Sequence, residues 1–430
     1  MNIIQRIIKQ PNIKNSLWII GEQIIQMVIS LVISILSARY LGPTNYGTLN
    51  YTASIVTLFS SIATLGMESV VIKRFIEEPK NEGKYIGGCI GLRTISSILS
   101  TLTICFIVCV LNPGDNVKLV MALLQSLQLL FRSVHILDSW FQRHLKSKFV
   151  SIGKMIAGIL VAAYKIYLLL SSKSVIWFAL NNTLSDLIVA IILYLFYRKE
   201  GNQRIEYRLD YGRDVLKDSY HFIISGLMVA LYGQMDKIMI GKALTDAEVG
   251  LYSIATGICG MWIFIPIAVI NSYRPMIMEL KNRGEESLYI RRLKQLYSAI
   301  IWMCIGVSSF ICIFGKVIIQ IMYGEAYLGA TSALKIAIWF ETFSMIGTAR
   351  GIWIVSENKN RYVKYYLGIG VLVNLVLNTA LIPVWGIDGA ALATLVTQIT
   401  TSLIAPLFFK DTRIHTKYVL DAFIFSWKKM

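Results

Sequence analysis

Apolar runs of about 20 residues recur along the whole chain and constrain its fold more than any other feature. Each run is about long enough to cross a hydrocarbon core of ~30 Å as a helix. Charged residues make up only 16% of the chain and the mean hydropathy is +0.60, whereas a soluble domain carries roughly 25% charged residues. Helix is the only open-ended structure that satisfies its own backbone in lipid. The sequence therefore predicts an all-α polytopic membrane protein.

We predict twelve spans with both chain ends on the cytoplasmic side. They cover residues 16–38, 46–70, 85–111, 117–140, 151–171, 174–197, 219–241, 247–272, 294–314, 330–355, 363–382 and 386–409. Lys and Arg cluster in every second connecting segment, starting with Arg6, Lys9 and Lys14, and are sparse in the others. This alternation follows the positive-inside rule. It also accounts for most of the net charge of +17 without nucleic acid as a partner. The first run is too long for the core of a signal peptide, so we expect a retained helix.

The longest cytoplasmic connection, near 198–218, divides the spans into two groups of six. We therefore expect an N-terminal lobe of residues 1–205 and a C-terminal lobe of residues 206–430. A weak internal repeat supports this division, because Leu41–Gly47 aligns with Leu244–Gly250 at a constant offset of 203 residues, as from Gly47 to Gly250. Both copies join the first and second spans of their lobe, which predicts parallel repeats of the kind found in secondary transporters.

Six segments resemble motifs of the polysaccharide-transporter branch of the multidrug/oligosaccharidyl-lipid/polysaccharide (MOP) flippase superfamily, the Wzx-type O-antigen flippases. These segments are Ser37–Gly47, Trp140–Phe149, Asp236–Gly241, Val249–Ala255, Tyr323–Ala330 and Ile382–Thr394. They fall in the family's order along nearly the whole chain. They are specific for the family and silent about the substrate.

The resemblance implies a MATE-like fold, with two six-helix lobes around a central cavity. It implies a flippase that moves undecaprenyl-diphosphate-linked oligosaccharides across the bacterial plasma membrane by alternating access, for O-antigen, capsule or exopolysaccharide. The partners implied are the lipid-linked substrate, membrane lipid, a polysaccharide polymerase and a chain-length regulator.

Passage of a sugar diphosphate through the bilayer requires polar and basic side chains inside the spans, where ionisable residues are costly. Arg93 and Ser97 share a face of the third span, and an Arg fork suits a diphosphate. Gln128, Arg132 and His135 share a face of the fourth span, and Lys165 lies in the fifth. An interior ion pair is the alternative role for Arg93, and an interfacial position for Arg132 or Lys165. We predict a substrate-binding set made of Arg93, Ser97, Gln128, Arg132, His135 and Lys165.

Two of the acidic residues inside the spans are candidates for cation or proton coupling, namely Glu22 in the first span and Glu341 in the tenth. A fixed ion pair with an Arg is the alternative for each. Counted this way, the candidate basic groups outnumber the acidic ones, which favours a phosphate-bearing substrate over the cargo of a cation-coupled multidrug or small-solute exporter.

Enzymatic activity is not expected. The outside loops are short, and no P-loop, metal cluster or Ser/His/Asp arrangement is present. The six cysteines lie inside apolar runs without a CxxC pair. A membrane polymerase or ligase of the same pathway is therefore the weaker alternative, and we expect no cofactor or metal. A flippase for the peptidoglycan precursor also fits the architecture.

Overall fold

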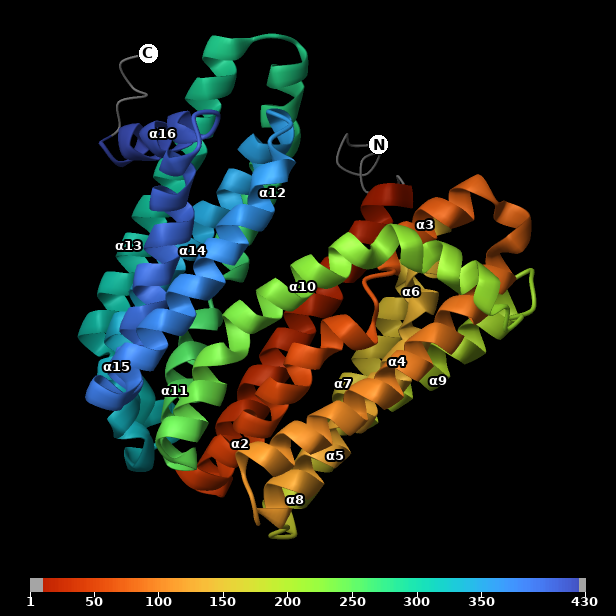
Figure 1. The fold of residues 1–430 in the computed structure, drawn as a ribbon, viewed down its shortest axis with the longest axis horizontal. Coiled ribbons are helices and arrows are strands. Elements are labelled where there is room, and N and C mark those ends of the chain that lie inside the picture. The colour runs from red at the N-terminus through yellow and green to blue at the C-terminus, as the bar shows by residue number, and fades with distance from the viewer. Residues whose placement is uncertain (1–10, 425–430) are drawn as a thin grey trace, which may run out of the picture. The chain divides into compact units, whose positions relative to one another are not determined.

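The computed structural model describes residues 11–424, which are mostly helical and contain no strand (Figure 1). Nine helical stretches in this part of the chain are long and apolar enough to cross a membrane. Two of them, Gly21–Glu77 and Asn360–Phe408, each contain two predicted spans, and the tenth predicted span forms α14 (Thr331–Ser356). The prediction of an all-α, multi-pass membrane protein is confirmed, and twelve spans fit these helices. Arg6 and Lys9, which we assigned to the cytoplasmic N-terminus, lie outside the described residues.

Two glycines break long helices at connections that the sequence predicts. Gly42 (φ 69°, ψ 170°) interrupts α2 (Pro11–Ala63), and Gly386 (φ 58°, ψ −136°) interrupts α15 (Val363–Ile399). A positive φ is readily adopted only by glycine. Each long helix is therefore two helices that meet at a sharp turn.

The described residues form two compact units, and the first unit contains residues 11–41 and 48–230. Besides parts of α2 and α10 (Leu209–Ala243), its helices are α3 (Glu68–Glu77), η1 (Pro79–Asn81), α4 (Glu82–Leu111), α5 (Asn116–Arg132), η2 (Ser133–His135), α6 (Ile136–Arg143), α7 (Ser147–Leu170), α8 (Val175–Phe178) and α9 (Leu180–Glu200). Helix α5 packs between α4 and α9, and α9 packs on α7. Buried apolar side chains around Trp140 and Phe141 form a core shared by α3, α4, α6, α7 and α9.

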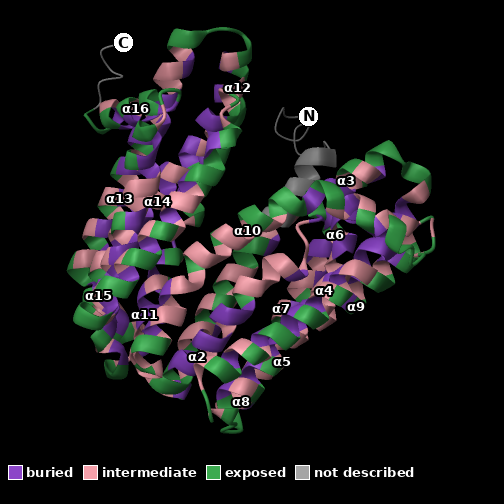
Figure 2. Cartoon of the chain, in the orientation of Figure 1, coloured by how far each residue is buried: buried purple, intermediate pink, exposed green. Residues whose placement is uncertain are grey.

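Exposed residues recur along the lengths of the helices (Figure 2), and many of them are large and apolar. On α4, Leu102 is 63% exposed and Phe106 is 69% exposed. A soluble protein rarely exposes such extended apolar surfaces. These faces are suited to contact with lipid chains.

The connection between the predicted lobes is fixed to α4. Gly83, Gly87 and Gly88 have no room for a Cβ, because the backbone of residues 204–212 lies against them. The amide of Glu206 donates to the carbonyl of Gly83 (3.1 Å), and the amide of Gly83 donates to Oε1 of Gln203 (3.0 Å). The expected lobe boundary after residue 205 consequently falls within the first unit, which extends to Ala230 inside α10.

The second unit contains residues 42–47 and 231–424. Besides the end of α10 and all of α14 and α15, its helices are α11 (Asp246–Gly260), α12 (Phe264–Asn282), α13 (Glu286–Tyr323), η3 (Glu325–Ala330), η4 (Asn360–Tyr362), η5 (Thr400–Ile404), η6 (Ala405–Phe408) and α16 (Arg413–Phe423). Helix α13 packs against α12, α14 and α16, and α15 packs against α14. An ion pair between Lys294 Nζ and Asp421 Oδ2 (2.7 Å) holds the short α16 on α13.

The two copies of the sequence repeat touch within this second unit. No Cβ fits on Gly47, which lies against the carbonyl of Asp246, or on Gly250, which lies against the carbonyl of Pro43. Asp246 precedes Gly250 by four residues, as Pro43 precedes Gly47. Each copy of the repeat thus makes the same backbone contact with the other copy.

Candidate functional site

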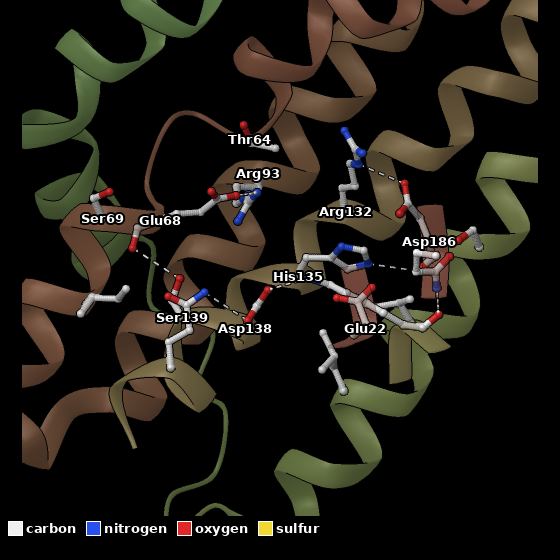
Figure 3. A pocket seen from close by; sticks show the side chains of 17 residues that line it. Glu22, Thr64, Glu68, Ser69, Arg93, Arg132, His135, Asp138, Ser139 and Asp186 are labelled. Carbon is white, nitrogen blue, oxygen red and sulfur yellow. Dashed lines mark hydrogen bonds and ion pairs between the residues drawn. The ribbon is translucent and has the colours of Figure 1, made fainter. Parts of the chain in front are cut away.

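A polar cavity of about 610 Å³ lies inside the first unit (Figure 3). Its walls come from α2, α3, α4, α5, η2, α6, α7 and α9, and from Thr64 after α2. The ionisable residues that line it are Glu22, Glu68, Arg93, Arg132, His135, Asp138, Lys154 and Asp186. Four of the predicted site residues, Glu22, Arg93, Arg132 and His135, are therefore brought together around one cavity.

Arg93 is the most deeply buried of these groups, with 1% of its surface exposed. Its Nη2 donates to Oε1 of Glu68 at 3.4 Å, whereas Nε and Nη1 have no hydrogen-bond partner among the described residues. Glu68, in the first turn of α3, is itself 64% exposed in its side chain. A buried guanidinium with two unused donor nitrogens is well suited to bind an anionic oxygen.

Arg132 and His135 both contact Asp186 of α9. Nε of Arg132 donates to Oδ2 of Asp186 at 3.0 Å, and Nε2 of His135 lies 3.1 Å from the carbonyl oxygen of the same residue. The chain passes from α5 into the 3₁₀ turn η2 at Arg132, and residues three apart in a 3₁₀ turn lie above one another. This local geometry directs both side chains to α9 (Figure 3).

Lys154 of α7 forms the third ion pair of the cavity, because its Nζ lies 3.3 Å from Oδ2 of Asp138. The backbone carbonyl of Lys154 accepts a hydrogen bond from Nε2 of Gln26 (2.5 Å), which ties α2 to α7. Each Arg and Lys that lines the cavity is thus paired with a carboxylate. Glu22 is the one lining carboxylate for which no such pair is found among the described residues, and only 8% of its surface is exposed.

The remaining predicted residues lie elsewhere. Ser97 donates to the carbonyl of Leu129 (2.8 Å) and so links α4 to α5, and Gln128 lines a smaller adjoining cavity. Lys165 lines neither cavity, and Glu341 is buried on α14 in the second unit. The lining residues Glu68, Asp138, Lys154 and Asp186 were not in the predicted set.

The larger cavity has four carboxylates against three permanently basic groups, which corrects our expectation that bases outnumber acids. The physical reason is that ion pairs formed between distant helices bring in carboxylates that a view of single helices leaves out. Arg132 and Asp186, for example, are 54 positions apart. No periodicity in the sequence connects them.

A second buried polar cluster surrounds Asp236 of α10 in the second unit. Its carboxylate accepts hydrogen bonds from Tyr252 Oη (2.6 Å), Asn378 Nδ2 (2.6 Å) and Thr394 Oγ1 (2.5 Å). These donors come from α11 and α15, and Asn374 in turn contacts both Asn378 and Thr394. A buried carboxylate with three donors is stable without a neighbouring base. The cluster joins three helices of the unit.

Residues 13–281, more than half of the chain, match the family described as "Polysaccharide biosynthesis protein". The chain belongs to this family. Among curated proteins, it is 22% identical to the lipid II flippase MurJ of Bacillus subtilis over 90% of this chain and 80% of that protein. It is 20% identical to a putative O-antigen transporter of Salmonella typhi over 51% of this chain and 55% of that protein.

Solved structures show that this member of the family shares its fold with MOP-superfamily transporters. A lipid II flippase MurJ in an inward closed conformation has a TM-score of 0.68 at 15% identity, covering 97% of this chain and 93% of its own. An inward-facing multidrug resistance transporter of the MATE family has a TM-score of 0.66 at 13% identity, covering 92% of this chain and 96% of its own. The relatives named here are flippases and transporters, not enzymes.

Proposed function

We propose that this protein is a flippase of the bacterial plasma membrane that moves undecaprenyl-diphosphate-linked oligosaccharide units to the outer leaflet, for the assembly of a surface polysaccharide. The observation that carries the proposal is the cavity of the first unit, where buried Arg93 retains two unused donor nitrogens beside carboxylate, amide and hydroxyl groups. Such a lining can replace the water around a sugar diphosphate. The polyprenyl chain can stay in lipid throughout.

Alternating access is the mechanism that we assign to this protein. The diphosphate would displace Glu68 from Arg93, because a phosphate oxygen is at least as good an acceptor as a carboxylate and the Glu68 side chain is already 64% exposed. Release at the outer face would restore the original pair.

Glu22 and Glu341 are the groups that we propose for cation or proton coupling. Glu22 lines the larger cavity without a paired base among the described residues, and Glu341 is 7% exposed on α14. A carboxylate held in such surroundings gains most from binding a cation or proton. Substitution of either residue by Gln should reduce the dependence of transport on an ion gradient.

One observation favours a second function. The excess of carboxylates in the larger cavity is suited to a cationic solute, as carried by a multidrug exporter. The ion pairs of Arg93, Arg132 and Lys154 neutralise all but one of these carboxylates, so we rank this function second.

A leaflet assay separates the two functions. In a deletion strain without redundant flippases, undecaprenyl-diphosphate-linked units should accumulate on the cytoplasmic side, and the gene should restore their exposure outside. Lipid extraction would identify whether polysaccharide units or peptidoglycan precursors accumulate. Normal exposure of both lipids in the deletion strain would instead support the exporter.

A further inference from the structure

A smaller cavity of about 270 Å³ adjoins the larger one within the first unit. The two cavities share Arg132, Ser185 and Asp186, so the Arg132–Asp186 ion pair (3.0 Å) stands on their common wall. The other lining residues come from α2, α5 and α9. Their chemistry differs from that of the larger cavity, because no further charged side chain is among them.

The smaller cavity offers neutral groups that both give and receive hydrogen bonds. The carboxamides of Gln128 and Asn182 make no hydrogen bond to other described residues, and a carboxamide has two donor protons and an acceptor oxygen. Thr57 and Ser60 give their hydroxyl protons to the carbonyls of Ala53 and Thr57 (2.8 Å each), so their oxygens face the cavity as acceptors. A sugar hydroxyl is both a donor and an acceptor, and this lining complements it.

The apolar part of the lining also fits a sugar ring. Val56 and Leu129 contribute aliphatic side chains, which can cover the C–H face of a pyranose. The cavity volume of about 270 Å³ leaves room for a sugar ring.

We propose that the smaller cavity binds the first sugar of the substrate, the residue joined to the diphosphate, and that it selects a neutral hexose or N-acetylhexosamine. The proposal rests on the proposed flippase function, because the diphosphate must lie beside the shared wall, within reach of the larger cavity where Arg93 has its unused donors. Arg132 and Asp186 neutralise each other, so an acidic sugar would add an uncompensated negative charge next to Asp186.

Binding to the purified full-length protein in lipid nanodiscs tests the proposal with three probes. The probes are undecaprenyl diphosphate, the same lipid carrying one N-acetylglucosamine, and the same lipid carrying one galacturonic acid. The wild-type protein should bind the N-acetylglucosamine probe about tenfold or more tightly than the bare lipid, as expected from two or more added hydrogen bonds. The galacturonic acid probe should bind no more tightly than the bare lipid.

The variants Gln128→Leu and Asn182→Leu should each remove most of this preference, by lowering the affinity for the N-acetylglucosamine probe far more than the affinity for the bare lipid. Gln320→Leu, at an exposed position of α13 outside both cavities, is the control and should bind all three probes as the wild type does. Elution as a single peak in size-exclusion chromatography establishes that each variant is folded.

The outcomes distinguish the subsite from the function. Equal affinity of the wild-type protein for the bare and the N-acetylglucosamine lipids would overturn the sugar subsite and leave the flippase proposal standing. If both Leu variants lowered the affinities for the bare lipid and for the N-acetylglucosamine lipid by the same factor, the subsite would also be overturned. If the wild-type protein bound no probe, the flippase proposal itself would fall, and the subsite with it.

Discussion

Gly47 and Gly250 lie backbone to backbone, so that a Cβ added to Gly47 would be 2.8 Å from the amide nitrogen of Gly250, and one added to Gly250 would be 3.2 Å from that of Gly47. These two glycines hold equivalent positions in the sequence repeat. The repeat is therefore a physical contact as well as a pattern. Each copy of the repeat makes the equivalent contact with the other copy, and therefore both need glycine at this position.

Substitution of either glycine should destabilise the protein. Gly47→Ala and Gly250→Ala place a Cβ against a backbone carbonyl, which cannot move aside as a side-chain tip can. We expect a loss of about 1–3 kcal/mol or more, typical of overpacking. Thermal unfolding in detergent measures it. Gly257→Ala, on the same helix α11 as Gly250, adds a Cβ that meets no atom within 4 Å, so this variant should melt like the wild type. Equal melting temperatures of all three variants would disprove the contact.

Arg93 should be required for transport through its guanidinium. We expect Arg93→Ala to lower the transport rate by roughly 10- to 100-fold, the value of a charge-assisted hydrogen bond, and Arg93→Lys to retain part of it. The leaflet assay provides the rate, at matched protein abundance. Lys199→Ala removes an exposed base outside both cavities and serves as the control. Normal transport by Arg93→Ala would show that Arg93 is not part of the substrate path.

The ion pair of Arg132 and Asp186 should contribute more to the transport rate than to the stability of the fold. The Arg132 side chain is 41% exposed but that of Asp186 only 14%, so loss of the pair should cost about 1–3 kcal/mol of stability. We expect Arg132→Ala to stop transport and Arg132→Lys to retain part of it. Comparison of the melting temperature with the transport rate separates the two effects, and a large loss of stability with normal transport would reverse this assignment.

The glycines of α4 should hold the connection between the predicted lobes. Gly87→Val places a side chain against the carbonyl of Glu206, and we expect residues 201–208 to become accessible to limited proteolysis. Gly91→Ala is a close control on the same helix, because its Cβ would meet only the flexible tip of Leu209 at 2.9 Å. An unchanged cleavage pattern in Gly87→Val would show that the connection does not depend on this glycine.

Asp236→Asn should destabilise the second unit. An Asn side chain places an NH₂ group where one of three donors now points, and the lost charge-assisted hydrogen bonds should cost about 1.5–3 kcal/mol. Thermal unfolding provides the measurement. Thr379→Val, exposed on α15 beside Asn378, should have little effect. A melting temperature unchanged by Asp236→Asn would mean that the cluster contributes nothing to stability.

Features that depend on neighbouring residues could be predicted from the sequence. The spans follow from hydropathy, and the turns at Gly42 and Gly386 follow from small or turn-forming residues between apolar runs. Arg93, Arg132 and His135 could be assigned to polar faces because helical spacing decides which side chains share a side. These three residues line one cavity.

Features that depend on pairing between distant segments could not be predicted. Glu68 and Arg93 are 25 positions apart, and no local pattern indicates that the start of one helix reaches the middle of another. Lys154 has the ordinary signature of a cytoplasmic loop charge, yet its partner Asp138 draws it into the cavity. Helix packing fixes such pairs, and a single sequence does not encode it in any periodicity.

The two compact units do not coincide with the two sequence halves, because each contains a piece of the other half. Residues 206–230 complete the first unit, and residues 42–47 complete the second. Each unit is therefore closed by a segment that comes from the far part of the same polypeptide. Either half expressed alone would lack a piece that its unit needs.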